Sequence, residues 1–275
     1  MTALPAEAGI ATLDPVWDTL RNEADAIVAT DPSLSSFIYS TILNQETLEA
    51  AVAHRVAERL RHADVSGDLI RQAFKQMVEA DRDYAAVLRA DVVAVYDRDP
   101  ACERFVEPVL YFKGFHAIQA HRLAHWAWGE GRRDFALYLQ SRSSQIFQTD
   151  INPQAKLGRG LFMDHATGVV MGATATVGND CSILHGVTLG GTGKESGDRH
   201  PKVGCGVLIG AGATILGNIS VGDCARVAAG SLVLKPVPDR TTVAGVPAKI
   251  VGMADCVRPS NTMDHLYEAA RREQE

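Results

Sequence analysis

The sequence predicts an α+β chain in which an all-helical N-terminal domain is followed by a parallel β-helix and a short C-terminal tail. Up to about residue 150, apolar residues recur at helical spacing, and from Ile151 onward an aliphatic residue recurs every six positions. We therefore divide the chain into a helical domain (1–149), a β-helix domain (150–252) and a tail (253–275).

The helical domain shows its pattern in several separate segments. Residues 48–62 and 68–80 place apolar side chains at i, i+3 or i+4 and i+7, with charged residues opposite. Residues 82–100 continue the pattern and stop at the Asp99–Pro100 step, because proline disfavours helix at the residue before it. Two further helices are predicted over 114–131 and 132–150, with a break at Gly129 and Gly131.

The six-residue period fits neither a helix nor one long strand. It fits a coil of short strands, in which three hexapeptides make one triangular turn of a parallel β-helix with the aliphatic residues inside. After a two-residue slip at 169–170 the period resumes, and the segment 192–202, polar and glycine-rich, is predicted to loop out. The inward residues are Ile151, Leu157, Met163, Met171, Val177, Ile183, Leu189, Val203, Ile209, Ile215, Val221, Val227 and Val233.

Composition excludes several classes of protein. A hydrophobic content of 46% and a charged content of 22% are those of an ordinary globular chain. A net charge of −6 argues against nucleic-acid and anionic-membrane partners. With no secretory leader and no apolar run of the roughly 18 residues that span a bilayer, we expect a cytoplasmic protein. The five cysteines show no CxxC spacing, so we expect no metal site from them.

The register of the coils brings candidate chemistry together. His165 and His185 fall at equivalent corners of successive coils, and Ala211 and Ala229 continue that column. Coils stack about 4.8 Å apart, so the column is a basic end followed by a smooth wall. Asp150, one coil earlier, is expected close to His165, where a carboxylate would orient the imidazole and raise its basicity. Spacing alone also allows a histidine that only stabilises the corner.

Five motifs in order carry a resemblance to a known family: "DINPQAKLGRG" (150–160), "DHATG" (164–168), "HGVTLGGTGK" (185–194), "GDRHPK" (197–202) and "AGVPAKIVG" (244–252). They resemble the serine O-acetyltransferases, which are hexapeptide-repeat acyltransferases, and the resemblance extends back through 97–101 and 111–126. It implies a left-handed β-helix and trimers that are commonly paired into a hexamer. It also implies acetyl transfer from acetyl-CoA to the hydroxyl of L-serine, in cysteine biosynthesis.

The resemblance and the chemistry of the side chains together assign roles. His165, oriented by Asp150, is the expected general base, because a free hydroxyl is a poor nucleophile near pH 7. The family's serine contacts map to Asp99, Asp164, Arg199 and His200. Acetyl-CoA is the co-substrate, with no permanently bound cofactor. Its expected contacts are His185, Gly191, Thr192, Ala211, Ala229, Lys235 and Lys249, and backbone N–H groups at 190–192 are expected to stabilise the oxyanion.

The same resemblance bears on assembly and regulation. Active sites of the family lie between neighbouring subunits, so the 192–202 loop is expected to complete a site on another copy. Cysteine competes at the serine site in many members, which makes feedback inhibition an expectation here. Many members end in isoleucine, which binds O-acetylserine sulfhydrylase; this sequence ends "REQE", which argues against that partner.

Two other functions remain open. A related enzyme could acetylate a sugar or antibiotic hydroxyl, although the long helical domain and the "GDRHPK" loop argue against it. A zinc-dependent lyase could use His165, His185 and His200 as ligands with an open position for water. The expected pairing of His165 with a carboxylate favours a free base over a metal ligand.

Overall fold

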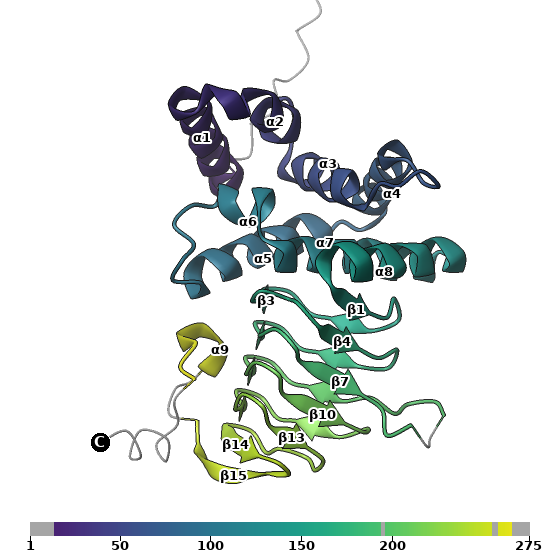
Figure 1. Cartoon of the computed structure of the whole chain (residues 1–275), viewed down its shortest axis with the longest axis vertical. Coiled ribbons are helices and arrows are strands. Elements are labelled where there is room, and N and C mark those ends of the chain that lie inside the picture. Colours follow the sequence, from purple (N-terminus) through teal and green to yellow (C-terminus); the bar gives the residue numbers. More distant parts are fainter. Residues whose placement is uncertain (1–13, 194–195, 255–257, 266–275) are drawn as a thin grey trace, which may run out of the picture.

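The computed structural model describes residues 14–193, 196–254 and 258–265. A helical region lies on one end of a stack of short strands (Figure 1). The helices of this region are α1 Pro15–Thr30, α2 Ser35–Ile38, α3 Leu48–Leu60, α4 Gly67–Ala80, α5 Tyr84–Arg98, α6 Val106–Leu110, α7 Lys113–Gly129 and α8 Arg133–Phe147. The predicted helices correspond to α3, α4, α5, α7 and α8, and α5 ends one residue before the Asp99–Pro100 step.

Local sequence signals explain where the helices begin. The side chain of Thr47 accepts a hydrogen bond from the backbone N–H of Ala50 at the start of α3, and Ser66 does the same for Leu69 at the start of α4. Helix α7 is buried along most of its length, because it lies between the other helices and the first coil of strands. None of the helices in the described ranges is long and apolar enough to cross a bilayer.

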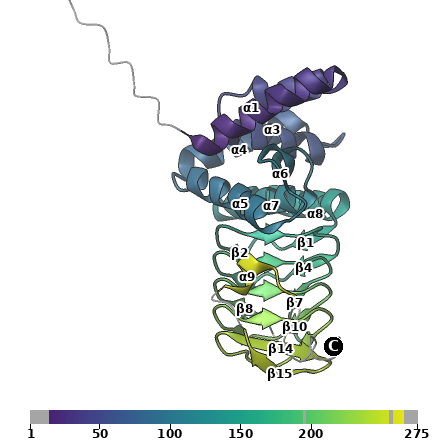
Figure 2. The same cartoon turned by 90° about the vertical axis from the view of Figure 1, so that its left-hand side faces the viewer.

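The strands form the three faces of a parallel β-helix, stacked below the helices (Figure 2). One face is ordered β1-β4-β7-β10-β13, the second β11-β8-β5-β2, and the third β15-β14-β12-β9-β6-β3, with only β14 and β15 antiparallel among the described pairs. Their bounds are β1 Thr149–Ile151, β2 Lys156–Leu157, β3 Phe162–Met163, β4 Val169–Met171, β5 Thr176–Val177, β6 Ser182–Ile183, β7 Thr188–Gly190, β8 Lys202–Val203, β9 Leu208–Ile209, β10 Thr214–Leu216, β11 Ser220–Val221, β12 Arg226–Val227, β13 Leu232–Val233, β14 Thr241–Gly245 and β15 Ala248–Met253.

The predicted hexapeptide register is confirmed. Every inward residue predicted from the six-residue period lies in a strand from β1 to β13, and all but the partly buried Leu157 are buried. Met163, Ile183 and Ile209 are direct partners on successive coils, as expected from their spacing. The predicted fold class, a helical region followed by a parallel β-helix, is therefore the observed one.

The two parts share their cores where they meet. Ile118 of α7 belongs to the core of the β-helix, whereas Phe162 of β3 belongs to the core of the helical region. The contact is close enough to require a glycine: a Cβ on Gly114 would lie 1.9 Å from the carbonyl oxygen of Met163. The start of α7 is thus fixed against the end of β3, which forms one wall of the pocket described below.

The end of the described chain returns to the helical region. A short helix, α9 (Pro259–Thr262), packs against α5 beside the third face of the β-helix (Figure 1). Ser260 in this helix is fully buried, and Arg258 forms an ion pair with Asp180, with 3.3 Å between Nη1 and Oδ2. Residues 258–265, which were predicted only as part of a tail, therefore have a defined place in the fold.

Candidate active site

A pocket of about 690 Å³ lies where the end of α5 and the start of α7 meet the corner between β3 and β4. It is lined by three of the predicted site residues, Asp99, Asp164 and His165, together with Lys113 and Thr167. Helix α5 ends immediately before Asp99, while Asp164 and His165 follow β3 directly. The structure thus brings these three predicted residues together from separate parts of the chain.

The corner that carries His165 has an unusual backbone. Two extra residues separate β3 from β4, and the chain accommodates them with positive φ angles at His165 (55°) and Ala166 (61°). This left-handed conformation costs a non-glycine residue roughly 1–2 kcal/mol. The buried Ala166 is held under the corner, and the His165 side chain projects outward with 73% of its surface exposed. Backbone strain of this kind persists only where the surrounding fold imposes it, and it is found most often at functional sites.

The electrostatics of the pocket favour a cationic group. His165 Nε2 lies 3.6 Å from Asp164 Oδ1. Burial raises the pKa of Asp164; the nearby His165 works against this shift, and the negative charge of Asp99 adds to it. A bound cation, such as the ammonium group of an amino acid, would therefore favour the ionised form of Asp164.

The column at this corner differs in one respect from the prediction. His165 and His185 are neighbours, with ring centroids 5.8 Å apart. The two histidines occupy equivalent positions when residues are counted forward from β3 and β6. When residues are counted back from β4 and β7, however, it is Thr167 that aligns with His185. The hydrogen bond from Gly186 N–H to Thr167 O (2.8 Å) agrees with the second count, in which the two extra residues, His165 and Ala166, precede Thr167.

The rest of the column follows the predicted register. Gly212 donates its N–H to His185 O (2.9 Å), and Gly230 donates to Ala211 O (2.8 Å). His185, Ala211 and Ala229 are therefore stacked on successive coils, each followed by a glycine of positive φ. Ala211 is half-buried and Ala229 is exposed, so the two alanines leave an accessible wall along the corner.

The predicted contact between Asp150 and His165 is not formed in this chain. The Asp150 carboxylate instead accepts a hydrogen bond from Gln140 Nε2 at 2.6 Å, and within the described ranges no ion pair or hydrogen bond joins it to His165. Asp150 lies on the outer surface of the first face, where it pairs with Val170 of the next coil. Val170 is five positions beyond His165 in the sequence. The register correctly placed Asp150 one coil away, but the extra corner residues carry His165 off the line of that strand. Its orienting role stays a prediction.

Arg199 and His200 come just before β8 and lie against Thr174, which is at the corner between β4 and β5 of the preceding coil. The hydroxyl of Thr174 accepts hydrogen bonds from the N–H groups of Arg199 (3.1 Å) and His200 (3.2 Å). It also lies 2.8 Å from His200 Nδ1, which accepts the N–H of Thr174 at 3.2 Å. An Nδ1 that accepts leaves the proton on Nε2. Burial, with the charges of Arg199 and Lys202, lowers the pKa of His200, which favours this neutral form.

One chain therefore does not assemble the whole predicted site. His185 precedes β7 and Gly191 follows it, so the corner of His165 and the base of the 192–202 loop lie at opposite edges of one face. Six residues of extended chain span up to roughly 20 Å. The side chain of Arg199 packs beside Gly191, where an added Cβ would lie 3.1 Å from its Cδ. Gly191, Thr192, Arg199 and His200 are thus grouped together, but away from His165.

The two lysines expected at the coenzyme lie at the far end of the β-helix. Lys235 follows β13, Lys249 lies in β15, and both side chains are exposed. In the part of the chain that the structure describes, neither forms an ion pair with an acidic residue. The column of His185, Ala211 and Ala229 runs towards the end of the β-helix that carries them.

The three histidines considered as zinc ligands are not brought together in one chain. His165 and His185 are neighbours at one corner, but His200 is bound to Thr174 at another. Across the described ranges, no three His, Cys, Asp or Glu side chains are grouped so that they could hold a metal ion.

Two residues of the site had no role in the sequence prediction. Lys113 lines the pocket and donates to Gln148 Oε1 (3.3 Å) and to Thr167 Oγ1. Thr174 holds the returning loop. Lys113 belongs to the "YFKGFHAI" stretch that resembles the family, so the sequence contained a signal for it. A single threonine in a coil of short strands has no such signal.

Replacing Thr174 with valine leaves two backbone N–H groups without their acceptor, at a cost of roughly 1–3 kcal/mol each. If Arg199 and His200 bind the substrate, as the family resemblance implies, KM for that substrate is expected to rise about tenfold. Valine has almost the same shape, so the coil should stay folded. Steady-state kinetics would measure the change, with Thr176→Val on the adjacent strand β5 as the matched control. Equal KM values for the two variants would contradict this role of Thr174.

Comparisons with known proteins show which family the chain resembles. Residues 16–120 match the family model for serine acetyltransferase, N-terminal, and residues 200–235 match the bacterial transferase hexapeptide model of six repeats. Over 255 residues the chain is 50% identical to the serine acetyltransferase of Escherichia coli strain K12, covering 93% of each protein.

Solved structures show the same likeness. The serine acetyltransferase of Brucella abortus strain S19, in complex with coenzyme A, is 64% identical with a TM-score of 0.89, covering 91% of this chain and all (100%) of that one. A serine acetyltransferase in complex with cysteine is 46% identical with a TM-score of 0.90, covering 92% of this chain and 98% of that one. Because these likenesses include both the helices that carry Asp99 and the coils that carry His165, the chain belongs to the serine acetyltransferase family.

Proposed function

We propose that this chain transfers the acetyl group of acetyl-CoA directly to the hydroxyl of L-serine, giving O-acetyl-L-serine and coenzyme A for cysteine biosynthesis. His165 takes the hydroxyl proton as the oxygen attacks the thioester carbonyl. The C–S bond then breaks, and the coenzyme leaves as the thiol after receiving a proton from the imidazolium. The observation that carries this proposal is the exposed His165 imidazole in a pocket that also holds Asp99 and Asp164.

Serine would be held at both of its charged ends. The carboxylates of Asp99 and Asp164 would receive the ammonium group, which matches the raised pKa of Asp164. The guanidinium of Arg199 offers a planar pair of donors for the carboxylate, and the neutral His200 offers its Nε2–H. Asp150 is proposed to orient His165, with Gln140 fixing its carboxylate.

Acetyl-CoA would lie along the corner column. Its pantetheine arm fits the wall of Ala211 and Ala229 below His185, with Lys235 and Lys249 placed for the phosphates of the coenzyme. The N–H groups of Gly191 and Thr192 make no backbone hydrogen bond within the described ranges, which leaves them available to the developing oxyanion. The coenzyme A complex of the Brucella relative supports this co-substrate.

The active site is proposed to form between neighbouring copies in a trimer, and the helical domains to join two trimers into a hexamer. The support is the separation of the two half-sites across one face of the β-helix. Because Arg199 and His200 lie away from the His165 corner of their own chain, an adjacent copy would supply them. The domain limits 1–149, 150–252 and 253–275 are retained as part of this proposal.

L-Cysteine is proposed to inhibit by occupying the serine site. It carries the same ammonium and carboxylate groups, so Asp99, Asp164 and Arg199 would bind it equally well, and the cysteine complex of a relative supports this. The "REQE" end, on which the expectation about O-acetylserine sulfhydrylase depends, lies outside the described residues, and that partnership is not proposed.

A thiol-release assay tests the function. With acetyl-CoA and a panel of amino acids, sugars and aminoglycosides, we expect coenzyme A release to depend on L-serine and mass spectrometry to show O-acetyl-L-serine. Pre-treatment with a chelator should leave the rate unchanged. Release that depends on a sugar or aminoglycoside would favour the alternative acceptor, and loss of activity on chelation would favour the zinc enzyme.

A further inference from the structure

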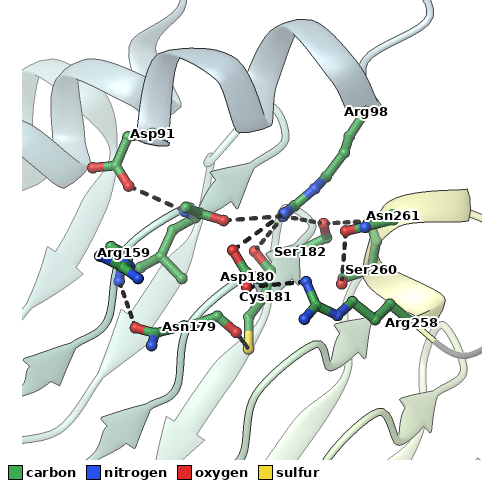
Figure 3. Close-up of polar contacts among 12 residues, drawn as sticks. Asp91, Arg98, Arg159, Asn179, Asp180, Cys181, Ser182, Arg258, Ser260 and Asn261 are labelled. Carbon is green, nitrogen blue, oxygen red and sulfur yellow. Dashed lines mark hydrogen bonds and ion pairs between the residues drawn. The ribbon is translucent and has the colours of Figure 1, made fainter. Parts of the chain in front are cut away.

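The last residue of α5, Arg98, is buried beside the pocket but does not line it. Only 8% of its surface is exposed, and its guanidinium points into the β-helix (Figure 3). Its Nη1 donates to the carbonyl oxygens of Gly160 (3.1 Å) and Cys181 (3.3 Å) and lies 3.3 Å from Ser182 Oγ. Its Nη2 is 3.9 Å from Asp180 Oδ1. One side chain thus connects the end of α5 to two successive coils.

The contact continues into α9. Ser182 Oγ, which accepts from Arg98, donates its own proton to the carbonyl oxygen of Ser260 at 2.8 Å. Both serines are fully buried. Arg258 binds Asp180 from the other side (Figure 3). A helix, two coils and the returning C-terminal segment therefore share one hydrogen-bonded cluster, formed by Arg98, Asp180, Ser182, Arg258 and Ser260.

The residue that follows Arg98 is Asp99, which lines the pocket. The backbone leaves the helical conformation at Asp99, and its Oδ1 accepts the N–H of Ala101 at 2.9 Å, so Oδ2 remains for a ligand. For both carboxylates to bind one ammonium group, Asp99 must face Asp164 across the pocket. Asp91, two turns earlier on α5, accepts a hydrogen bond from Leu161 N–H at 3.1 Å. Of these two contacts between α5 and the β-helix, the one made by Arg98 is nearer to Asp99.

We propose that Arg98 is a positioning residue for the amino-acid substrate, acting through Asp99, and that α9 contributes by fixing Ser182. This inference rests on the proposed function, since it assumes that Asp99 receives the ammonium group of serine. The planar guanidinium supplies donors to several acceptors in one geometry, whereas a lysine would retain the charge but not that geometry. Displacement of a binding group by about 1 Å can cost up to about a hundredfold in rate.

The test is a double-mutant cycle on the full-length enzyme. Arg98→Lys is expected to raise KM for L-serine about tenfold, while KM for acetyl-CoA stays within about twofold of the wild type. Asp99→Asn should raise KM for serine more strongly. If Arg98 acts through Asp99, the double variant will match Asp99→Asn, because interacting residues are not additive. A purely structural role would give additive effects and change both KM values.

Two further variants complete the design. Arg142→Lys is the matched control, because Arg142 also donates to backbone carbonyls, of Leu60 (3.1 Å) and Arg61 (3.2 Å), away from the pocket. Ser182→Ala serves if Arg98→Lys does not fold, with an expected rise of about threefold in serine KM that disappears in the Asp99→Asn background. Additive effects in either cycle would overturn the inference. A wild type that releases no thiol with serine would instead overturn the proposed function.

Discussion

Replacing His165 with alanine is expected to lower kcat by about 10²- to 10⁴-fold, which is the usual contribution of a general base. The expected loss follows from geometry, because His165 projects into the pocket that holds Asp99 and Asp164. The side chain is 73% exposed, so its removal opens no cavity in the core and the free energy of unfolding should change little. Thiol release at saturating serine and acetyl-CoA measures kcat, and thermal unfolding measures stability.

His165→Asn separates the chemistry from the backbone. Asparagine tolerates positive φ angles better than alanine does, so it preserves the corner while removing the base. His185→Ala is the matched control, because its ring lies 5.8 Å away on the next coil but is assigned to the coenzyme. That variant should raise KM for acetyl-CoA and leave kcat within about tenfold of the wild type. A His165→Asn enzyme with a kcat near the wild-type value would show that the base is another group.

Mixing two inactive variants is expected to restore activity. His165→Ala removes the proposed base from one half-site, and Arg199→Ala removes the proposed carboxylate-binding group from the other. If each site combines His165 of one copy with Arg199 of the next, random mixing at equal amounts leaves about a quarter of the sites with both residues intact. Activity should rise from near zero to about that fraction of the wild-type value.

The mixing experiment has an internal control. When a chain that carries both substitutions is mixed with wild type, about a quarter of the sites in the mixture should keep both residues intact. The single variants, unmixed, should stay inactive. The two chains must be co-expressed or refolded together, because an assembled oligomer need not exchange its subunits. Activity no higher than that of the separate variants would show that both residues act within one chain, which would require the 192–202 loop to move.

The hexapeptide period predicted the β-helix well because each inward position makes the same physical demand. Met163, Ile183 and Ile209 must all fill one narrow interior, so an aliphatic residue every six positions reports the strand register directly. The grouping of Asp99 with Asp164 and His165 came only from resemblance to a family. No sequence pattern links the end of α5 to a corner more than sixty residues later.

Other features could not be predicted because they depend on side-chain direction or on single hydrogen bonds. Register placed Asp150 one coil from His165, but the direction of the imidazole depends on how the backbone accommodates two extra corner residues. Thr174 holds the loop through one hydroxyl. Helix α9 has four residues, too few for any periodicity to show, and it is held in place by the buried Ser260.

The stacking of whole coils also limits how the enzyme can change. Coils add length in steps of about 4.8 Å, so the span from the histidine corner to the terminal lysines can take only certain values. If acetyl-CoA lies along the corner column as proposed, the number of coils sets the length of acyl carrier that the β-helix can bind. Adding or removing one coil means adding or removing three hexapeptides at once. The β-helix therefore could not adapt to a shorter or longer carrier by small changes in its length.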